Sequence, residues 1–242
     1  MSEFKIPTEI IELPSQGLLY PEGSELAKGT VEMKYMTARE EDILTNQAYI
    51  KNGTVLDKLM KSLIVSKINY DDLLIGDKNA IMVAARVLGY GKNYTFTYND
   101  EEHTVDLSLL ENKPLNPEIK TAKSNQFSFE LPHSCNNITF RLLTHKDEQD
   151  INSELEGLKK INKDSSADLS TRLKYIITSV EGKTERADIR NFVDNYLLAK
   201  DSRALREYIK ELQPDVDMTY FPSDGGSGFN IPIGVSFFWP DL

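Results

Sequence analysis

Few side chains in this 242-residue sequence have the type and spacing of nucleophiles or metal ligands. Cys135 is the only cysteine, so an intramolecular disulfide is impossible and a thiolate zinc site would lack partner thiols. The histidines are His103, His133 and His145, and no two of them have the i, i+4 spacing of a helical metal site. We therefore expect no metal ion, and we expect Cys135 to be a small apolar residue near a strand.

Carboxylates and glycine-rich stretches are the remaining candidates for chemistry. Two acidic side chains could act as the general acid and base of a glycosidase, but the acidic runs at 40–42 and 71–72 lie near expected helix starts, where the helix dipole favours negative charge. The stretch "GYG" at 89–91 lacks the P-loop pattern and indicates the end of a helix, and "GGSG" at 225–228 indicates a hairpin tip. Since no GxSxG motif surrounds a serine, the sequence predicts no catalytic residue, no cofactor and a protein that is not an enzyme.

Composition and charge restrict the classes of protein and partner. Hydrophobic residues make up 40% of the chain, which is enough for a core, and charged residues make up 27%. The net charge is −10 with both signs interspersed, so we expect no nucleic-acid partner, because such a partner requires clustered lysine and arginine. No apolar run approaches the ~20 residues of a membrane helix, and the first residues lack the pattern of a secretory signal. We therefore expect no membrane partner and a location in the cytosol where the chain is made.

Hydrophobic periodicity predicts an α+β protein with a helical body, two small antiparallel β-hairpin units and no parallel βαβ sheet. A T-x-x-E capping box at Thr37 and Glu40 starts a helix that should run to about Ala48. Asn99 and Asp100 fit the turn of a hairpin. Further helices are expected near 54–64, 77–88, 146–161, 168–177, 185–198 and 202–212, and strands near 10–13, 31–35, 92–107, 127–132, 137–143, 216–221 and 229–238.

The best candidate for a domain boundary is the stretch "NKPLNPEIKTAKSNQ", which carries prolines and lysines between the expected elements. We expect residues 1–112 to hold an extended segment, helices and the first hairpin. Residues 113–125 would be a connector, and residues 126–242 would hold a strand pair, a helical bundle and a C-terminal hairpin.

Two apolar segments with bracketing prolines, "LPSQGLLYP" and "IPIGVSFFWP", lie near the two ends of the sequence. Each is either a peripheral strand packed on the core or a docking segment, because aromatic anchors dominate the energetics of protein interfaces. The candidate partner-binding residues are Pro14, Ser15, Gly17, Leu18, Tyr20, Phe237, Phe238, Trp239 and Pro240. We expect the last strand to be mostly intramolecular, with Phe237 or Trp239 buried in a small C-terminal β-unit.

Five blocks of the sequence, in this order, resemble the signature blocks of the baseplate hub assembly proteins of T4-like tailed bacteriophages: "LPSQGLLYP", "MTAREEDILTN", "VLGYGKNYTF", "DSRALREYI" and "IPIGVSFFWP". The resemblance covers nearly the whole chain, and the first and last blocks are the most specific. It implies a late viral protein that acts in the host cell cytoplasm as a non-enzymatic, chaperone-like assembly factor for the central hub. Its partner would be a hub protein or the tape-measure protein, and it need not remain in the mature virion.

Two alternatives stay open beside this hypothesis. The protein could be a permanent structural subunit of the baseplate hub, or an enzyme such as a peptidoglycan hydrolase. Many relatives in the family carry CxxC-type zinc knuckles at the tips of two hairpins, whereas the corresponding stretches here contain no cysteine, and residues 221–225 stand where C-P-x-C-G would be. The resemblance therefore implies hairpins held by strand pairing and packing, without metal. The oligomeric state is not specified by the sequence.

Overall fold

A computed structural model describes residues 5–122, 124–161, 167–222 and 227–238 of the chain. Within these residues every strand pair is antiparallel, and the sheets contain two or three strands accompanied by helices. This arrangement confirms the predicted α+β class. The described residues form four small sheets, where the sequence predicted two hairpin units.

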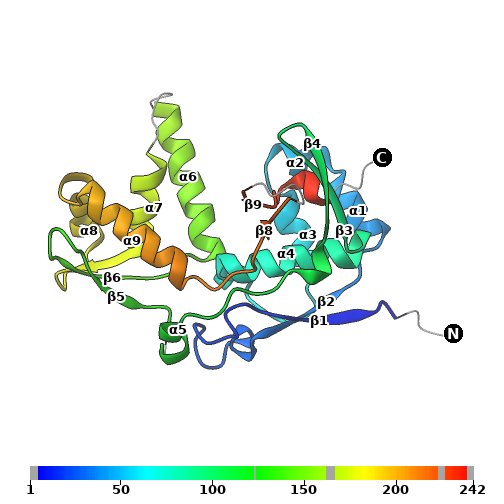
Figure 1. Ribbon diagram of the computed structural model, residues 1–242, viewed down its shortest axis with the longest axis horizontal. Helices are drawn as coiled ribbons and strands as arrows, with labels where there is room; N and C mark the ends of the chain where they lie inside the picture. Colours follow the sequence, from blue (N-terminus) through cyan, green and yellow to red (C-terminus); the bar gives the residue numbers. More distant parts are fainter. Residues whose placement is uncertain (1–4, 123, 162–166, 223–226, 239–242) are drawn as a thin grey trace.

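The first lobe, on the right in Figure 1, is built mainly from strands and helices of the first half of the chain. These are β1 (Thr8–Glu12), β2 (Thr30–Lys34), α1 (Ala38–Leu44), α2 (Gln47–Lys51), α3 (Val55–Leu63), α4 (Ile75–Tyr90), β3 (Asn93–Tyr98) and β4 (Glu101–Asp106). In β2 the predicted alternation buries Val31 and Met33. Asn99 and Asp100, between β3 and β4, have positive φ angles of 51° and 64°, which confirms the expected tight turn.

The helix expected to run from the capping box to about Ala48 is divided into two. Glu40 completes the capping box, because its Oε2 accepts a hydrogen bond from the backbone N–H of Thr37 at 3.0 Å. α1 nevertheless ends at Leu44, and Asn46 starts α2 by accepting hydrogen bonds from the N–H groups of Ala48 and Tyr49. The expected single helix is wrong because asparagine offers the backbone a new N-cap at this position.

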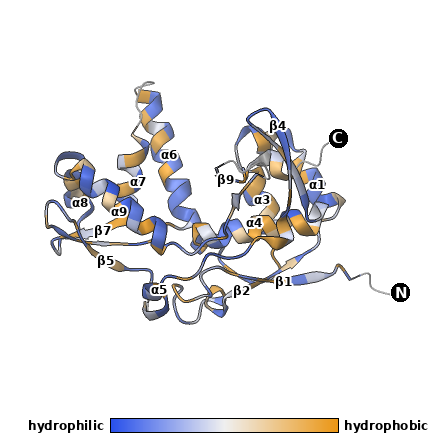
Figure 2. Ribbon diagram, viewed as in Figure 1, coloured by the Kyte–Doolittle hydropathy of each residue, from blue (hydrophilic) through white to orange (hydrophobic). Residues whose placement is uncertain are grey.

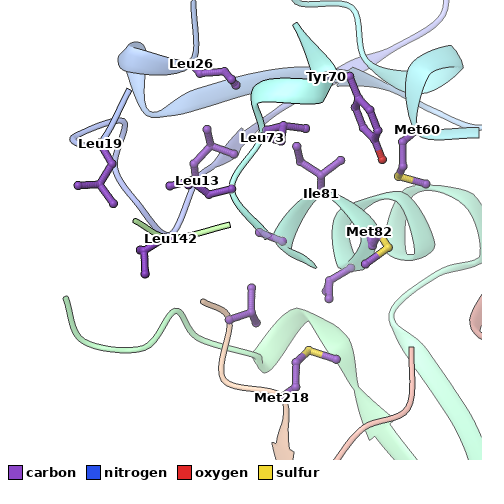
Figure 3. Close-up of a cluster of buried hydrophobic side chains, with 14 of the residues drawn as sticks. Leu13, Leu19, Leu26, Met60, Tyr70, Leu73, Ile81, Met82, Leu142 and Met218 are labelled. Carbon is purple, nitrogen blue, oxygen red and sulfur yellow. The ribbon is translucent and has the colours of Figure 1, made fainter. Parts of the chain in front are cut away.

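α4 is the central helix of the first lobe, and most of its ribbon is hydrophobic in Figure 2. Figure 3 shows how its residue Ile81 lies in a cluster with leucines from distant parts of the chain. Leu13, Leu19 and Leu26 come from the N-terminal segment, and Leu142 comes from the second lobe. Burial of these side chains, at roughly 2 kcal/mol each, ties the N-terminal segment and the start of the second lobe to α4.

The second lobe packs helices against a three-stranded sheet. Its elements are β5 (Phe127–Glu130), β6 (Asn137–Phe140), α6 (His145–Ile161), α7 (Asp168–Ile176), β7 (Ile177–Val180), α8 (Arg186–Asn195) and α9 (Ala199–Leu212). β7 pairs with β6, so the expected helical position of Ile177 is wrong. Pairing of a short segment rich in β-branched residues with an existing strand outweighs the helical spacing seen in the sequence. Figure 1 shows α6 standing upright at the side of this lobe that faces the first lobe.

Cys135 lies in the turn between β5 and β6, with a positive φ of 54°. Its side chain is exposed, so the prediction that Cys135 fills space as a small apolar residue is wrong. The turn is held by Asp201, whose carboxylate accepts hydrogen bonds from the N–H groups of His133 and Ser134 at 2.8 and 3.1 Å. These backbone contacts fix the turn and leave the thiol in solvent.

The segment expected to connect two domains contains a short helix, α5 (Pro117–Thr121), whose residue Ile119 is fully buried. Asn116 starts it by accepting a hydrogen bond from the N–H of Glu118. After α9 the chain passes between the two lobes a second time. The two connecting segments run side by side, because the backbone N–H of Lys113 donates to the carbonyl of Asp215. The division of the chain at 113–125 stays a prediction.

The C-terminal segment returns to the first lobe (Figure 1). It forms a two-residue strand pair, β8 (Thr219–Tyr220) with β9 (Phe229–Asn230), and then a 3-10 helix, η4 (Val235–Phe238). The expected final strand is therefore wrong in type, whereas the expected burial of Phe237 is confirmed. Phe237 and Phe238 are adjacent and both fully buried; a strand would direct them to opposite faces.

Candidate functional site

The N-terminal signature segment, residues 13–21, is anchored on a buried carboxylate of α4. Asp77 Oδ1 accepts a hydrogen bond from the N–H of Ser15 at 2.9 Å. Asp77 Oδ2 accepts from Ser15 Oγ at 2.6 Å and from the Tyr20 hydroxyl at 2.5 Å, and the Tyr20 oxygen accepts from the N–H of Leu74 at 3.0 Å. Burial raises the pKa of Asp77, and the hydrogen bonds from Ser15 and Tyr20 oppose that rise. Asp77 and Ser15 are fully buried, so this cluster holds the segment in place and is closed to a substrate.

The rest of the signature segment is also mostly inside. Pro14 is buried. Gly17 has a φ of +77°, and a Cβ on it would lie 2.5 Å from the carbonyl oxygen of Ala27, so only glycine fits. Leu18 is 38% exposed and is the one predicted residue of this segment that faces solvent to that extent.

The aromatic residues of the C-terminal signature pack against β3 and α4. The Phe237 ring meets the Tyr94 ring edge-on at 4.8 Å and the Phe238 ring at 5.3 Å. Both phenylalanines are fully buried, and η4 contacts α4. Trp239 and Pro240 lie outside the described residues. The two signature segments thus meet the same helix, and most of their described residues act as internal packing.

A polar cleft of about 850 Å³ separates α3 and α4 from α6, and it contains a cluster of titratable side chains. Lys78 Nζ lies 3.0 Å from His145 Nδ1 and 3.2 Å from Asp57 Oδ1. His145 Nε2 lies 3.3 Å from Asp57 Oδ2, and Gln149 Nε2 lies 3.0 Å from His145 Nε2. The Tyr70 ring covers the imidazole edge-on at 4.6 Å.

The geometry of this cluster suits a structural link better than catalysis. The Lys78 ammonium can only donate, so His145 Nδ1 accepts from it, while His145 Nε2 faces both Asp57 and Gln149. Burial disfavours the Asp57 carboxylate, but His145 and Lys78 outweigh that effect and hold the pKa of Asp57 well below its usual range. His145 is only 2% exposed. Its nitrogens are both occupied, so the cluster joins the first lobe to the start of α6.

An open apolar groove of about 470 Å³ runs along β1 on the surface of the first lobe. Its floor is formed by α4, including Val83 and Val87, and its walls are the edge of β1 and the segment 107–112. Among the described residues that line the groove, only Glu9 and Glu12 are charged. Ile10, on its rim, is 71% exposed. Such a surface can bind an apolar chain by excluding water.

Sequence reasoning missed both the polar cluster and the groove. The five residues of the cluster come from four separate elements, and only His145 and Gln149, four residues apart on α6, are linked by a spacing in the sequence. The groove has a partial signal in the strand pattern of residues 8–12, but the neighbouring elements that complete it are distant in the sequence.

Comparison with known proteins leaves the family of the chain open. No protein-family model matches the sequence, and comparisons with curated proteins and with solved structures give no match. In the described ranges, no helix combines the length and apolar character needed to cross a bilayer. The same ranges hold no group of three or more His, Cys, Asp or Glu side chains placed to bind a metal ion.

Proposed function

We propose that this protein is a non-enzymatic, chaperone-like assembly factor for the central hub of a tailed-phage baseplate, and that it binds a hub or tape-measure protein. The proposal begins from the resemblance of five sequence blocks to that family. It places the activity in the host cell cytoplasm, before the tail is complete.

The observation that carries the proposal is the open apolar groove beside β1. An assembly factor must hold an apolar segment of another protein and later release it, and an open groove lined by aliphatic side chains permits both. The best alternative site, the cleft around His145, has its polar groups paired with one another. The groove therefore supports binding as the function more strongly than the cleft supports catalysis.

Coexpression with candidate hub and tape-measure proteins of the same phage tests the proposal. The tagged full-length protein should capture one of them, and the variant Ala84→Arg should lose that capture because a long charged side chain would enter the floor of the groove. Ala187→Arg is the matched control, because Ala187 is exposed on α8 in the other lobe. Capture that is equal in both variants would remove the groove from the proposal.

Mass spectrometry of purified tails separates the assembly factor from a permanent hub subunit. We expect the protein to be absent from finished tails or present far below the stoichiometry of hub proteins. A zymogram with cell-wall substrate tests the enzymatic alternative. Clearing that disappears after one Asp or Glu substitution would replace our proposal with a hydrolase.

A further inference from the structure

We propose that the groove binds its partner by strand addition: an extended, basic segment of another protein pairs with the free edge of β1. The segment would present an apolar side chain at every second position and lysine or arginine between them. This inference rests on the proposed function for the class of partner, and it adds the binding mode and the chemistry that is recognised.

The outer edge of β1 has backbone groups available for pairing. In β2, the N–H of Glu32 donates to Ser66 Oγ at 2.8 Å and its carbonyl accepts from the N–H of Val65 at 2.9 Å, so both point away from β1. Ile10 lies opposite Glu32 and is therefore in a non-hydrogen-bonded pair, with its own N–H and C=O directed outward. The same alternation turns the backbone groups of Thr8 and Glu12 outward. In the described part of the chain, no hydrogen bond occupies this edge.

The groove lies directly beside this edge and has the shape that an added strand requires. β1 contacts α4, and it lies along the lower side of the first lobe, below that helix, in Figure 1. A strand paired with β1 would direct alternate side chains toward Val83 and Val87 on the groove floor. Main-chain hydrogen bonds would then provide affinity, and the apolar floor would select the side chains.

Charge identifies the kind of segment that fits. Glu9 and Glu12 are exposed on β1, and lysine and arginine are absent from the described residues that line the groove. The chain as a whole carries a net charge of −10, which also favours a basic partner. A second copy of this chain fits poorly, because its own Glu9 and Glu12 would add negative charge to an edge whose described groove residues include no lysine or arginine.

Fluorescence anisotropy with the full-length protein and a labelled peptide that alternates valine and lysine tests the inference. Two matched probes accompany it: the same peptide with its alternate amides N-methylated, and a version with glutamate in place of lysine. We expect the valine–lysine peptide to bind, and each altered probe to bind about tenfold more weakly or not at all. Equal binding of the N-methylated probe would overturn strand addition.

Two variants assign the binding to β1. Ile10→Pro removes one outward N–H without touching the β1–β2 ladder, and it should weaken binding of the valine–lysine peptide about tenfold. Ser128→Pro places proline at the equivalent outward position of the edge strand β5 and should leave binding unchanged. Glu12→Lys, which does not affect the backbone, should weaken the same peptide about two- to fivefold and reduce the salt dependence. Unchanged binding in both β1 variants would overturn the inference.

The outcome for strand addition is separable from the outcome for the proposed function. Capture of a hub or tape-measure protein that survives Ile10→Pro would refute strand addition and leave the assembly role intact. Peptide binding at β1 with no capture of any tail protein would refute the assembly role and leave the binding mode intact. A concentration-dependent dimer that Ile10→Pro abolishes would instead identify the edge as a self-interface and overturn the inference.

Discussion

Replacing Asp77 with alanine should show whether the N-terminal signature segment is an internal anchor. The substitution removes the acceptor for the N–H and hydroxyl of Ser15 and for the hydroxyl of Tyr20, all of them buried. Each buried donor left without a partner costs about 1–3 kcal/mol. Part of this cost is offset, because the substitution also removes a carboxylate whose burial is unfavourable, as its raised pKa indicates. We expect a net loss of about 2–4 kcal/mol in the free energy of unfolding.

Circular dichroism during thermal and urea unfolding measures this loss. For a chain of this length, we expect the Tm to fall by about 4–16 °C. Asp42→Ala is the matched control, because Asp42 is exposed on α1, and its Tm should remain within about 2 °C of the wild-type value. Equal Tm values for the two variants would refute the view that Ser15 and Tyr20 are structural, and would return them to the set of docking residues.

Three further predictions concern the aromatic tail, a buried glutamate and the polar cluster. Phe237→Ala should cost about 3–5 kcal/mol in unfolding free energy, whereas Phe221→Ala, at a ring that is 70% exposed, should cost under about 1 kcal/mol; equal costs would contradict the burial of the tail. Burial opposes ionisation of Glu40, but hydrogen bonds from Thr37, Lys34 and Ser62 outweigh it and lower its pKa to about 2. Because the folded pKa is depressed, the stability that Glu40 contributes is present above its unfolded pKa of about 4.3 and is lost toward pH 2, so the difference between wild type and Glu40→Gln should shrink over that range in urea titrations. Lys78→Met should cost about 1–3 kcal/mol in the same assay because it leaves Asp57 less compensated, and Lys61→Met, at an exposed ion pair, should cost under about 1 kcal/mol.

The fold class and most elements could be predicted from the sequence, because their signals are local. The alternation in β2, the capping box at Thr37 and the turn at Asn99 each depend on a few neighbouring residues. The errors arise where tertiary contacts decide between two local options. β7 is a strand because β6 lies beside it, and the final aromatic residues form a 3-10 helix because both must enter the core.

The candidate sites were less accessible to sequence reasoning. Apolar residues bracketed by prolines indicate that a segment is buried against something, and they do not say whether that surface belongs to the same chain. Here Tyr20 meets Asp77 and Phe237 meets Tyr94, so these side chains lie within the protein. The sequence alone could not show that the outer edge of β1 is unpaired. The pairing of β2 with residues 64–66 decides which backbone groups of β1 point outward.

The return of the C-terminal segment to the first lobe has a consequence for biosynthesis. Tyr94 and Phe96 belong to the first half of the chain, yet Phe237, Phe229 and Tyr220 supply the rings that pack on them. During translation, Tyr94 and Phe96 therefore lack these packing partners until the second lobe and the C-terminal segment have been synthesised. We expect closure of this long loop to come late in folding, so the nascent chain should be most exposed to aggregation just before that step.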